Sequence, residues 1–504
     1  MIKTWKLLVA AILMAFFFQS PSAANDSAGF SRLPRWRGFN LLEKFSKDWS
    51  NKPFVEEDFR LISSLGFNFV RLPMDYRVWI KNNDINQFDE AVLRDVDRAV
   101  EWGGKYGVHV CINFHRAPGY CVNASKNEAN NLWTDALAQA ACARHWAFFA
   151  DRYKAIPSER LSFNLFNEPP GIDDETYYNT VKIVVEAIRA KDPDRLIICD
   201  GTEWGRKPVS KLVYLKVAQA TRGYFPMNLS HYKASWIQGA DRCSVPVWPM
   251  AQVNSYLYGP WKMELQTPLV IEGDFKKDTL LRIRVDTVST LSRLLIKEGS
   301  RVFLDKTFKC GSGDGEWKKS VYCPGLKSYQ NIYDKDYYAR IPAGTGRVEI
   351  ENVEGDWLTF SEIGLKNRDG SGTEKLLEPL ARWGDKQVTA QFDPRNSAAP
   401  FQTTVMIDRE YMWNESILPW KNLELLGSGI IVGEWGAYNR APHTVTLAWM
   451  KDCLANWKKA GWGWALWNFR GAFGVLDSDR KDVNYEDFEG HKLDRKMLDL
   501  LKAY

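Results

Sequence analysis

Short apolar runs alternate with amphipathic stretches along most of the chain. The apolar runs are typical of strands buried on both faces, and they cover residues 36–41, 67–73, 108–115, 161–166, 195–201, a segment reaching His231, 429–433 and 463–468. The stretches between them predict helices over residues 55–65, 89–106, 131–153, 176–191, a short segment near Val209, 409–425, 444–459 and 493–502. A strand–helix unit repeated eight times predicts an α/β fold, the (β/α)8 or TIM barrel.

Residues 263–406 interrupt this repeat with a different pattern. Apolar and polar residues alternate there in several short segments, which are separated by turns rich in Gly, Asp and Lys. The pattern predicts an antiparallel β-sandwich inserted after the sixth barrel strand. We therefore expect a signal segment (1–24), a first barrel part (25–262), the sandwich (263–406) and a second barrel part (407–504). Because loops after barrel strands lie on the catalytic face, the insertion is expected beside the cleft.

The first 24 residues have the pattern of an export signal. Lys3 and Lys6 give a basic start, residues 7–18 are apolar but too short to span a bilayer, and residues 21–24 resemble a cleavage site. No later stretch reaches the roughly 20 apolar residues of a membrane helix. We expect a secreted or periplasmic protein that has no membrane partner after signal removal.

Composition narrows the choice of partners. The net charge of +5 over 504 residues comes without a basic run, which argues against nucleic acid and leaves a neutral ligand possible. The 22 tryptophans favour a glycan, because sugars present apolar C–H faces to flat aromatic rings. For any single tryptophan a place in the core is the better expectation, and the candidates for a cleft are Trp204, Trp236, Trp248, Trp261 and Trp435.

The eight cysteines are too few to form a disulfide scaffold for a chain of this length. Cys310 with Cys323, and Cys121 with Cys142, are near enough in sequence to pair, and the sequence leaves both pairings open. No Cys-x-x-Cys or His-rich spacing indicates a metal site, so we expect no metal and no organic cofactor. We also expect a monomer.

Two glutamates directly follow buried strands. Residues 161–166 lead into an Asn-Glu-Pro-Pro motif that contains Glu168, and residues 430–432 lead into a Gly-Glu-Trp-Gly motif that contains Glu434. One such motif alone has an ordinary alternative, in which the glutamate caps the next helix. Two of the same design favour a catalytic pair, because glycoside hydrolysis needs one carboxyl group to protonate the leaving oxygen and another to attack the anomeric carbon or activate water.

Polar and aromatic residues recur at the ends of the other predicted strands. In chain order these positions are Asn40, Arg71, His115, Asn167 with Glu168, Asp200 with Glu203, His231, Glu434 and Trp467. Each one has an ordinary explanation by itself, such as a surface ion pair or a buried histidine. Because all of them fall at the end of the barrel where side chains meet over one pocket, together they predict a ligand site.

These residues resemble the motifs of glycoside hydrolase family 5, a family of retaining cellulases and mannanases. The resemblance covers about residues 35–261 and 409–504, and it rests on Arg71 in VRLP, His115 in NFH, Asn167 and Glu168 in FNEP, His231, Glu434 in GEWG and Trp467 in ALWN. It implies that Glu168 is the general acid/base and Glu434 the nucleophile. It also implies that Arg71 orients Glu434 and that Asn167 binds the sugar 2-hydroxyl.

The resemblance further implies that His115, His231 and Trp467 line subsite −1. Family members usually have a His-x-Tyr sequence at the sixth strand, with the tyrosine hydroxyl against the nucleophile. Here His231 is followed directly by Tyr232, and an offset of one residue on a strand turns a side chain to the opposite face unless a bulge intervenes. Tyr232 is the candidate for this role, and Asn40 and Glu203 complete the predicted substrate-binding set.

The predicted function is a retaining glycosidase that cleaves β-linked polysaccharides or oligosaccharides, of β-glucan or mannan type, by double displacement. One alternative is a non-catalytic carbohydrate-binding protein on the same fold, although such proteins normally lack one of the two glutamates. Another is a transglycosylase, which would use the same catalytic residues. The sandwich resembles carbohydrate-binding modules only in outline, and it either binds glycan or shapes the cleft.

Overall fold

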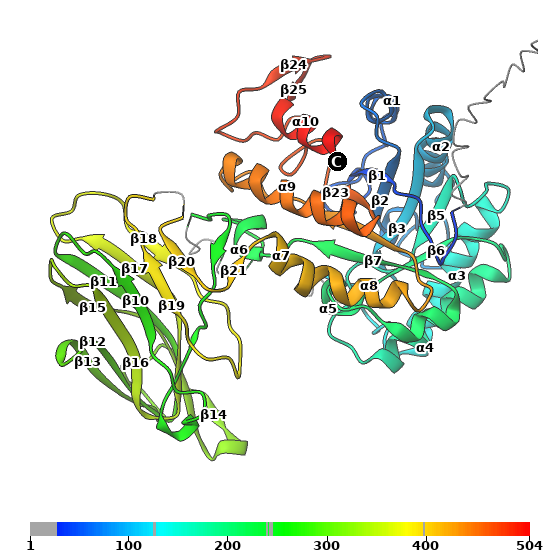
Figure 1. Cartoon of the computed structure of the whole chain (residues 1–504). Helices are drawn as coiled ribbons and strands as arrows, with labels where there is room; N and C mark the ends of the chain where they lie inside the picture. Colours follow the sequence, from blue (N-terminus) through cyan, green and yellow to red (C-terminus); the bar gives the residue numbers. More distant parts are fainter. Residues whose placement is uncertain (1–27, 124–127, 238–239, 241–244, 397–398) are drawn as a thin grey trace, which may run out of the picture.

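The computed structural model describes residues 28–504 except 124–127, 238–239, 241–244 and 397–398. Figure 1 shows a barrel surrounded by helices and, beside it, a sandwich of β-sheets. The blue-to-green N-terminal segment and the orange-to-red C-terminal segment both belong to the barrel, and the green-to-yellow sandwich lies between them in the sequence.

Eight parallel strands form the barrel. They are β1 (Arg37–Asn40), β2 (Phe69–Asp75), β3 (His109–Ala117), β5 (Leu161–Asn164), β6 (Ile197–Asp200), β7 (Ala218–Gly223), β22 (Ile430–Trp435) and β23 (Gly463–Leu466). The order β2-β1-β23-β22-β7-β6-β5-β3 is closed by the pairing of β2 with β3, and the two-residue strand β4 (Tyr120–Cys121) adds to β3. These strands are apolar and buried because helices cover the outside and side chains fill the interior. The predicted fold is confirmed.

The helices begin and end at residues suited to those positions. In α2 (Glu90–Tyr106) the Asp89 carboxylate accepts a hydrogen bond from the Ala91 N–H, and Gly107 ends the helix in the left-handed conformation. Leu93 and Val100 lie on its buried face. The other α-helices are α1 (Glu56–Ser64), α3 (Ala136–Tyr153), α4 (Asp174–Arg189), α5 (Thr202–Gly205), α6 (Met227–Ser230), α7 (Arg409–Met412), α8 (Leu418–Glu424), α9 (His443–Ala460) and α10 (Arg495–Ala503).

Two sheets with a core of their own form the sandwich. One has the order β13-β12-β16-β10-β19-β20, and the other has the order β14-β15-β11-β17-β18 with β9 beside β17. The strands are β9 (Tyr256–Tyr258), β10 (Leu269–Gly273), β11 (Thr279–Ser289), β12 (Leu291–Glu298), β13 (Arg301–Lys309), β14 (Tyr322–Cys323), β15 (Ser328–Ile341), β16 (Arg347–Gly355), β17 (Trp357–Asn367), β18 (Lys375–Leu377), β19 (Thr389–Phe392) and β20 (Phe401–Thr403). The period of two is clear in β11, where Leu281, Ile283 and Val285 are buried between less buried neighbours. One pair, β10 with β19, is parallel, so the sandwich is not purely antiparallel as expected.

The chain leaves and re-enters the barrel through a short ladder. Strand β8 (Met250–Ala251) pairs antiparallel with β21 (Met406–Ile407). Nearby, the Asn228 side chain on α6 donates a hydrogen bond to Glu378 at 2.6 Å, and Arg382 donates to the hydroxyl of Tyr411 on α7. These contacts tie the sandwich to the loop region that follows the sixth barrel strand. A small hairpin of β24 (Glu486–Phe488) and β25 (His491–Leu493) precedes the last helix.

The sixth barrel strand ends earlier than expected. Strand β7 stops at Gly223, and Pro226 and the helical turn α6 follow it, so that His231 lies after a helix. The prediction of a strand that reaches His231 is therefore wrong. The physical reason is Pro226, which has no N–H to continue a ladder and is well suited to precede a helix.

Three other expectations concern the described part of the chain. Cys121, Cys142, Cys310 and Cys323 are all free thiols, so neither proposed disulfide is present. In the segments that the structure describes, no helix has the length and apolarity needed to cross a membrane, and no group of His, Cys, Asp and Glu side chains is arranged to hold a metal ion. The predicted signal segment, residues 1–24, lies outside the described residues.

Candidate active site

Four barrel strands bring charged side chains together at their carboxyl ends. Arg71 comes from β2, Glu168 from the segment after β5, Arg222 from β7 and Glu434 from β22. Parallel strands with a common direction place these ends at one mouth of the barrel. All four side chains are largely or fully buried, so their interactions are little screened by water.

Arg71 is fixed by four hydrogen bonds. Its Nη1 donates to Glu434 Oε1 at 2.6 Å and to Asn40 Oδ1 at 3.0 Å. Its Nε donates to Asn164 Oδ1 at 2.9 Å, and its Nη2 donates to Asn167 Oδ1 at 2.7 Å. The guanidinium therefore holds the Glu434 carboxylate in one orientation. The same contacts satisfy the buried amide oxygens of Asn40 and Asn164 at the ends of their strands. The Asn40 amide nitrogen also donates to backbone oxygens of β22 and β23.

Arg222 connects the two glutamates. Its Nε donates to Glu168 Oε1 at 3.0 Å, and its Nη2 lies 3.2 Å from Glu434 Oε1. The same Nη2 donates to Asp200 and, at 3.0 Å, to Asn167 Oδ1. Burial alone would lower the pKa of this arginine, but the carboxylates of Asp200, Glu434 and Glu168 raise it above its usual value. One permanently charged guanidinium therefore faces both candidate catalytic carboxyl groups.

The backbone at Glu168 is held in an unusual conformation. Its φ of 50° lies in the left-handed region, which costs a non-glycine residue about 1 kcal/mol or more. Two contacts hold it there: the Glu168 N–H donates to Asp200 Oδ2 at 2.8 Å, and the Tyr120 hydroxyl donates to the Glu168 carbonyl at 2.6 Å. The two prolines that follow add stiffness. The chain thus turns sharply after β5 and directs the carboxyl group toward Arg222.

The two glutamates have different surroundings. Burial, and next the Glu434 carboxylate, raise the pKa of Glu168 to about 8, against a smaller opposing effect of Arg222. Glu168 is therefore protonated at neutral pH and can donate a proton. Glu434, in contrast, lies against two guanidinium groups, with its Oε1 2.6 Å from Arg71 Nη1 and 3.2 Å from Arg222 Nη2. Such a pair, with one proton donor and one anion, suits the division of labour in acid-assisted nucleophilic substitution.

The Asn167 amide is oriented by both arginines. Its Oδ1 accepts from Arg71 and Arg222, which fixes the amide so that Nδ2 points away from them. That Nδ2 is buried and has no hydrogen-bond partner among the described residues. A buried donor without a partner is costly, so it is well placed to bind a hydroxyl group of a ligand.

Neutral histidines and aromatic rings border the charged cluster. Burial, with help from Arg71 and Arg222, lowers the pKa of His115 to about 3, and burial lowers the pKa of His231 to about 4. The ring of His115 lies 6.0 Å from that of partly exposed Trp467. These side chains offer hydrogen bonds and flat apolar surfaces without adding charge.

Comparisons with known proteins agree with this geometry. Residues 25–223 match the family described as Cellulase (glycosyl hydrolase family 5). The first six strands of the barrel are therefore similar to those of a glycoside hydrolase family 5 domain. The match itself ends with the sixth strand, so it includes Glu168 and Arg222 but not Glu434.

The relatives of this chain are distant. Endoglucanase C of Acetivibrio thermocellus is 28% identical over 200 residues, which are 39% of this chain and 57% of that protein. Glucan 1,3-beta-glucosidase 2 of Saccharomyces cerevisiae is 27% identical over 190 residues, 32% of this chain and 33% of that protein. This chain thus spans about half, or less, of the length of these relatives. A crystal structure described as a glycoside hydrolase has a TM-score of 0.59 and 26% identity, and the similarity covers 93% of this chain and 98% of that one.

The tyrosine beside Glu434, the predicted nucleophile, is Tyr224. Its hydroxyl donates to Glu434 Oε2 at 3.3 Å, and burial, with Glu434 and Glu168, raises its pKa well above the usual value, so it stays protonated. Tyr232, the residue predicted for this role, lies instead within the hydrophobic core after α6. The prediction failed because the strand ends at Gly223. Once the end of β7 is placed at Gly223, Arg222-Gly223-Tyr224 has the spacing of the family's His-x-Tyr sequence, with arginine in place of histidine.

His231 still reaches the candidate site, although it comes from the turn after α6. Its ring lies 4.9 Å from that of Tyr224, and its Nδ1 is hydrogen-bonded to Ser230 Oγ at 2.9 Å. Glu203 does not join the cluster: its side chain is exposed, while its neighbour in the prediction, Asp200, is fully buried in the network around Arg222.

The tryptophan candidates divide into core and surface rings. Trp435 is fully buried and packs against Trp457 and Trp464, so it does not line the cleft. Trp248 is partly buried and hydrogen-bonded to Asp452, whereas Trp204 and Trp261 are exposed. Trp236 is 55% exposed and lies 6.2 Å from the His231 ring, which places it at the border of the site.

Sequence reasoning missed four residues of the site. Arg222 and Tyr224 can be recognised only when the end of β7 is known. Asn164 can be recognised only when the direction of the side chains on β5 is known, and Trp49 lies in a loop. Trp49 is 67% exposed and lies 4.9 Å from Phe45, whose ring contacts His115 and Trp467. The signal for Arg222 and Tyr224 was present in the R-x-Y spacing, which becomes visible once Pro226 is taken as the end of the strand.

Proposed function

We propose that the chain is a retaining glycosidase that hydrolyses a β-linked glucan. The observation that carries the proposal is the sharing of Arg222 by Glu168 and Glu434, with contacts of 3.0 and 3.2 Å. A retaining mechanism needs the two carboxyl groups about 5 to 5.5 Å apart, and an inverting one needs a wider gap for water. A single guanidinium in contact with both favours the shorter separation.

In the first half-reaction Glu434 attacks the anomeric carbon. Its orientation is fixed by Arg71 and Tyr224, and as its oxygen forms a bond with that carbon, the bond to the leaving oxygen breaks. Glu168 donates its proton to that oxygen. The Asn167 Nδ2 donor is placed to bind the neighbouring sugar hydroxyl, where a hydrogen bond that strengthens in the transition state accelerates the reaction.

In the second half-reaction Glu168 takes a proton from water, which attacks the anomeric carbon and releases Glu434. The charges of the cluster support this exchange of roles. With Glu168 protonated, Arg71 and Arg222 balance Glu434 and Asp200. In the glycosyl-enzyme Glu434 is an ester and Glu168 is the carboxylate, so the balance is preserved. Arg222 contacts both groups and therefore faces an anion in each state.

The proposed substrate class comes from the relatives and from the aromatic rings. The two relatives described above are named for action on glucans, one an endoglucanase and one a 1,3-beta-glucosidase. Exposed or partly exposed Trp49, Trp236 and Trp467 border the site and offer stacking surfaces for pyranose rings. Further parts of the proposal are export from the cell through residues 1–24 and action as a monomer without a cofactor.

The test is a screen of the purified protein against β-linked polysaccharides and aryl β-glycosides, with Glu168→Ala and Glu434→Ala alongside. We expect hydrolysis of at least one β-glucan, which Glu434→Ala abolishes while glycan binding remains measurable. Added acceptor sugar shows whether the glycosyl group passes to water or to another sugar. If Glu434→Ala kept most of the activity, or a glycan bound without being cut by the unmodified protein, the proposed mechanism would be wrong.

A further inference from the structure

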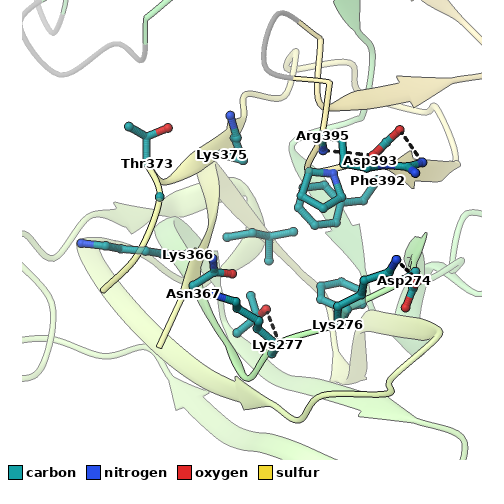
Figure 2. Close-up of a pocket in the computed structure, with 15 residues that line it drawn as sticks. Asp274, Lys276, Lys277, Lys366, Asn367, Thr373, Lys375, Phe392, Asp393 and Arg395 are labelled. Carbon is teal, nitrogen blue, oxygen red and sulfur yellow. Dashed lines mark hydrogen bonds and ion pairs between the residues drawn. The ribbon is translucent and has the colours of Figure 1, made fainter. Parts of the chain in front are cut away.

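A concave site lies in the inserted sandwich, and none of its lining residues belongs to the barrel. Its cavity has a volume of about 530 Å³, within the range of small-ligand sites. Three chain segments meet there: residues 274–279, which lead into β11, residues 365–375, from the end of β17 to the start of β18, and residues 392–395, from the end of β19. Figure 2 shows the side chains of these segments, with the Lys366 side chain extending away from the others.

The inner surface of this pocket is apolar with hydroxyl and amide groups near it. Phe275, Leu365 and Phe392 are buried, and the rings of the two phenylalanines lie 5.5 Å apart. Thr279 and Asn367 are direct partners in the β11–β17 ladder, so they lie side by side at the same edge. Apolar surface beside hydrogen-bonding groups suits a pyranose ring, which has C–H faces and peripheral hydroxyls.

Positive charge dominates the rim. The lining residues include five cations and two carboxylates, namely Lys276, Lys277, Lys366, Lys375 and Arg395 with Asp274 and Asp393. The two carboxylates each pair with a cation of the rim, and Lys277 pairs with Asp369 at 3.0 Å. Among the described residues, Lys366 and Lys375 have no carboxylate partner, but Lys366 lies on the opposite face of β17 from Leu365 and Asn367, so Lys375 is the one of the two that faces the pocket. Anionic groups are therefore the expected complement of this pocket.

Lys375 has an ordinary alternative role. It lies on β18, the edge strand of its sheet, where lysine discourages another strand from adding. It is also the direct cross-strand partner of Leu365, so both side chains lie on the face that includes the pocket. Edge protection accounts for this one lysine. It does not account for Lys276, Lys277 and Arg395, which come from two other loops.

We propose that this pocket binds a uronate unit of an acidic polysaccharide. The apolar surface contacts the sugar ring, and the lysines pair with its carboxylate. The Thr279 hydroxyl donates to the Lys277 carbonyl and the Asn367 amide donates to Ser371, so the oxygens of these two side chains accept hydrogen bonds from the sugar hydroxyls. Because the ammonium groups are largely exposed, the charge contribution is modest for each lysine and decreases with salt. The sandwich then selects a polymer by its acidic units, independently of the reaction at the barrel.

The experiment compares two ligands that differ only in the carboxylate. Binding of cellotetraose and of its C6-oxidised, tetra-glucuronate counterpart is measured by calorimetry at low and high salt, on the whole chain with Glu434→Ala so that neither ligand is hydrolysed at the barrel. The variant Lys276→Glu with Lys375→Glu removes the charge of the pocket. The matched control is Lys318→Glu with Lys335→Glu, which makes the same change at exposed lysines elsewhere on the sandwich.

We expect the acidic tetrasaccharide to bind at least tenfold more tightly than the neutral one at low salt. The pocket variant should lose at least tenfold in affinity for it, and the control variant should lose less than twofold. Hydrolysis of a small neutral aryl glycoside, measured with Glu434 intact, should be unchanged in both, which separates this proposal from that for the barrel. Equal binding of the two tetrasaccharides, equal losses in both variants, or displacement by acetate at the same concentration would overturn the proposal.

Discussion

Replacement of Arg222 by methionine should slow the second half-reaction more than the first. Arg222 is the cation that contacts Glu168, and the second half-reaction is the one in which Glu168 is a carboxylate. A hydrogen bond to a charged partner contributes about 1.5 to 3 kcal/mol. Since about 1.4 kcal/mol corresponds to a factor of ten in rate, deglycosylation should slow by about 10- to 150-fold.

The same loss should shift the pH dependence. Without Arg222 the Glu168 carboxylate is less stable, so its proton is released at higher pH. The energy range given above corresponds to about one to two pH units, because one unit is about 1.4 kcal/mol. The alkaline limb of kcat/KM for an unactivated substrate should therefore move upward by about that amount in Arg222→Met.

The assay uses two substrates in rapid-mixing experiments. A 2,4-dinitrophenyl β-glycoside has a leaving group that needs no proton, so its first half-reaction depends little on Glu168. With Arg222→Met we expect a burst of dinitrophenol followed by a slow steady rate and a lowered KM. An unactivated glucan should show no burst. Equal losses on both substrates, with no burst and an unmoved pH profile, would refute the assigned role.

Two controls separate this effect from loss of stability. Arg222→Met leaves the fully buried Asp200 without its cation, which costs about 3 to 5 kcal/mol. Adding Asp200→Asn removes the unpaired charge and should restore folding without restoring deglycosylation. Arg195→Met is the matched control, because Arg195 is also buried and pairs with Asp192, before β6 and away from the two glutamates. This substitution should lower Tm without producing a burst.

Three further predictions concern single groups. Tyr224→Phe should lower kcat by about tenfold through loss of a hydrogen bond to Glu434, while Tyr232→Phe should change kcat less than twofold; the reverse result would restore Tyr232 to the role beside the nucleophile. In the unmodified protein, activity on unactivated substrates should fall tenfold per pH unit above about pH 8, as Glu168 loses its proton, and an alkaline limb retained in Glu168→Gln would contradict this assignment. Burial, and next Asp58, raise the pKa of Glu43 to about 7, above its unfolded value, so stability present below about pH 4.5 is lost as pH rises toward 7. Glu43→Gln should therefore raise the free energy of unfolding at pH 8 by up to about 3 kcal/mol and change it little at pH 4, as measured by denaturant titration, whereas exposed Glu101→Gln should do neither.

The barrel was predictable because its signals are local and repeated. Apolar runs followed by amphipathic stretches recur along the chain for every barrel strand except the more polar sixth, and parallel pairing follows from that order. The two candidate catalytic glutamates were predictable for a related reason: Glu434 lies near the end of the buried strand β22, and Glu168 comes four residues after the buried strand β5, so their positions at the barrel mouth depend mainly on these strands. The sandwich was equally visible through its period of two.

The prediction of Arg222 and Tyr224 as site residues depends on where strand β7 ends. Strand β7 contains Gln219, Thr221 and Arg222, which look too polar for a buried barrel strand, yet each is buried because its polar atoms are bonded to neighbours. A search for an apolar strand therefore overlooked these residues, and the sixth strand was predicted to end at His231 instead of Gly223. The parallel pair β10–β19 and the buried place of Trp435 were also beyond reach, because both follow from contacts between segments far apart in sequence.

The ladder between β8 and β21 has a consequence for how the chain folds. Ala251 pairs with Met406, so the two ends of the inserted segment lie next to each other. For the barrel, the whole sandwich is therefore equivalent to one long loop with joined ends. The entropy of closing such a loop grows only with the logarithm of its length, so the size of the insertion matters little once that ladder forms. A tight turn between Ala251 and Met406 would connect the same two barrel segments. The sandwich is therefore a separate unit, and its deletion or replacement by another domain would leave the order of the barrel strands unchanged.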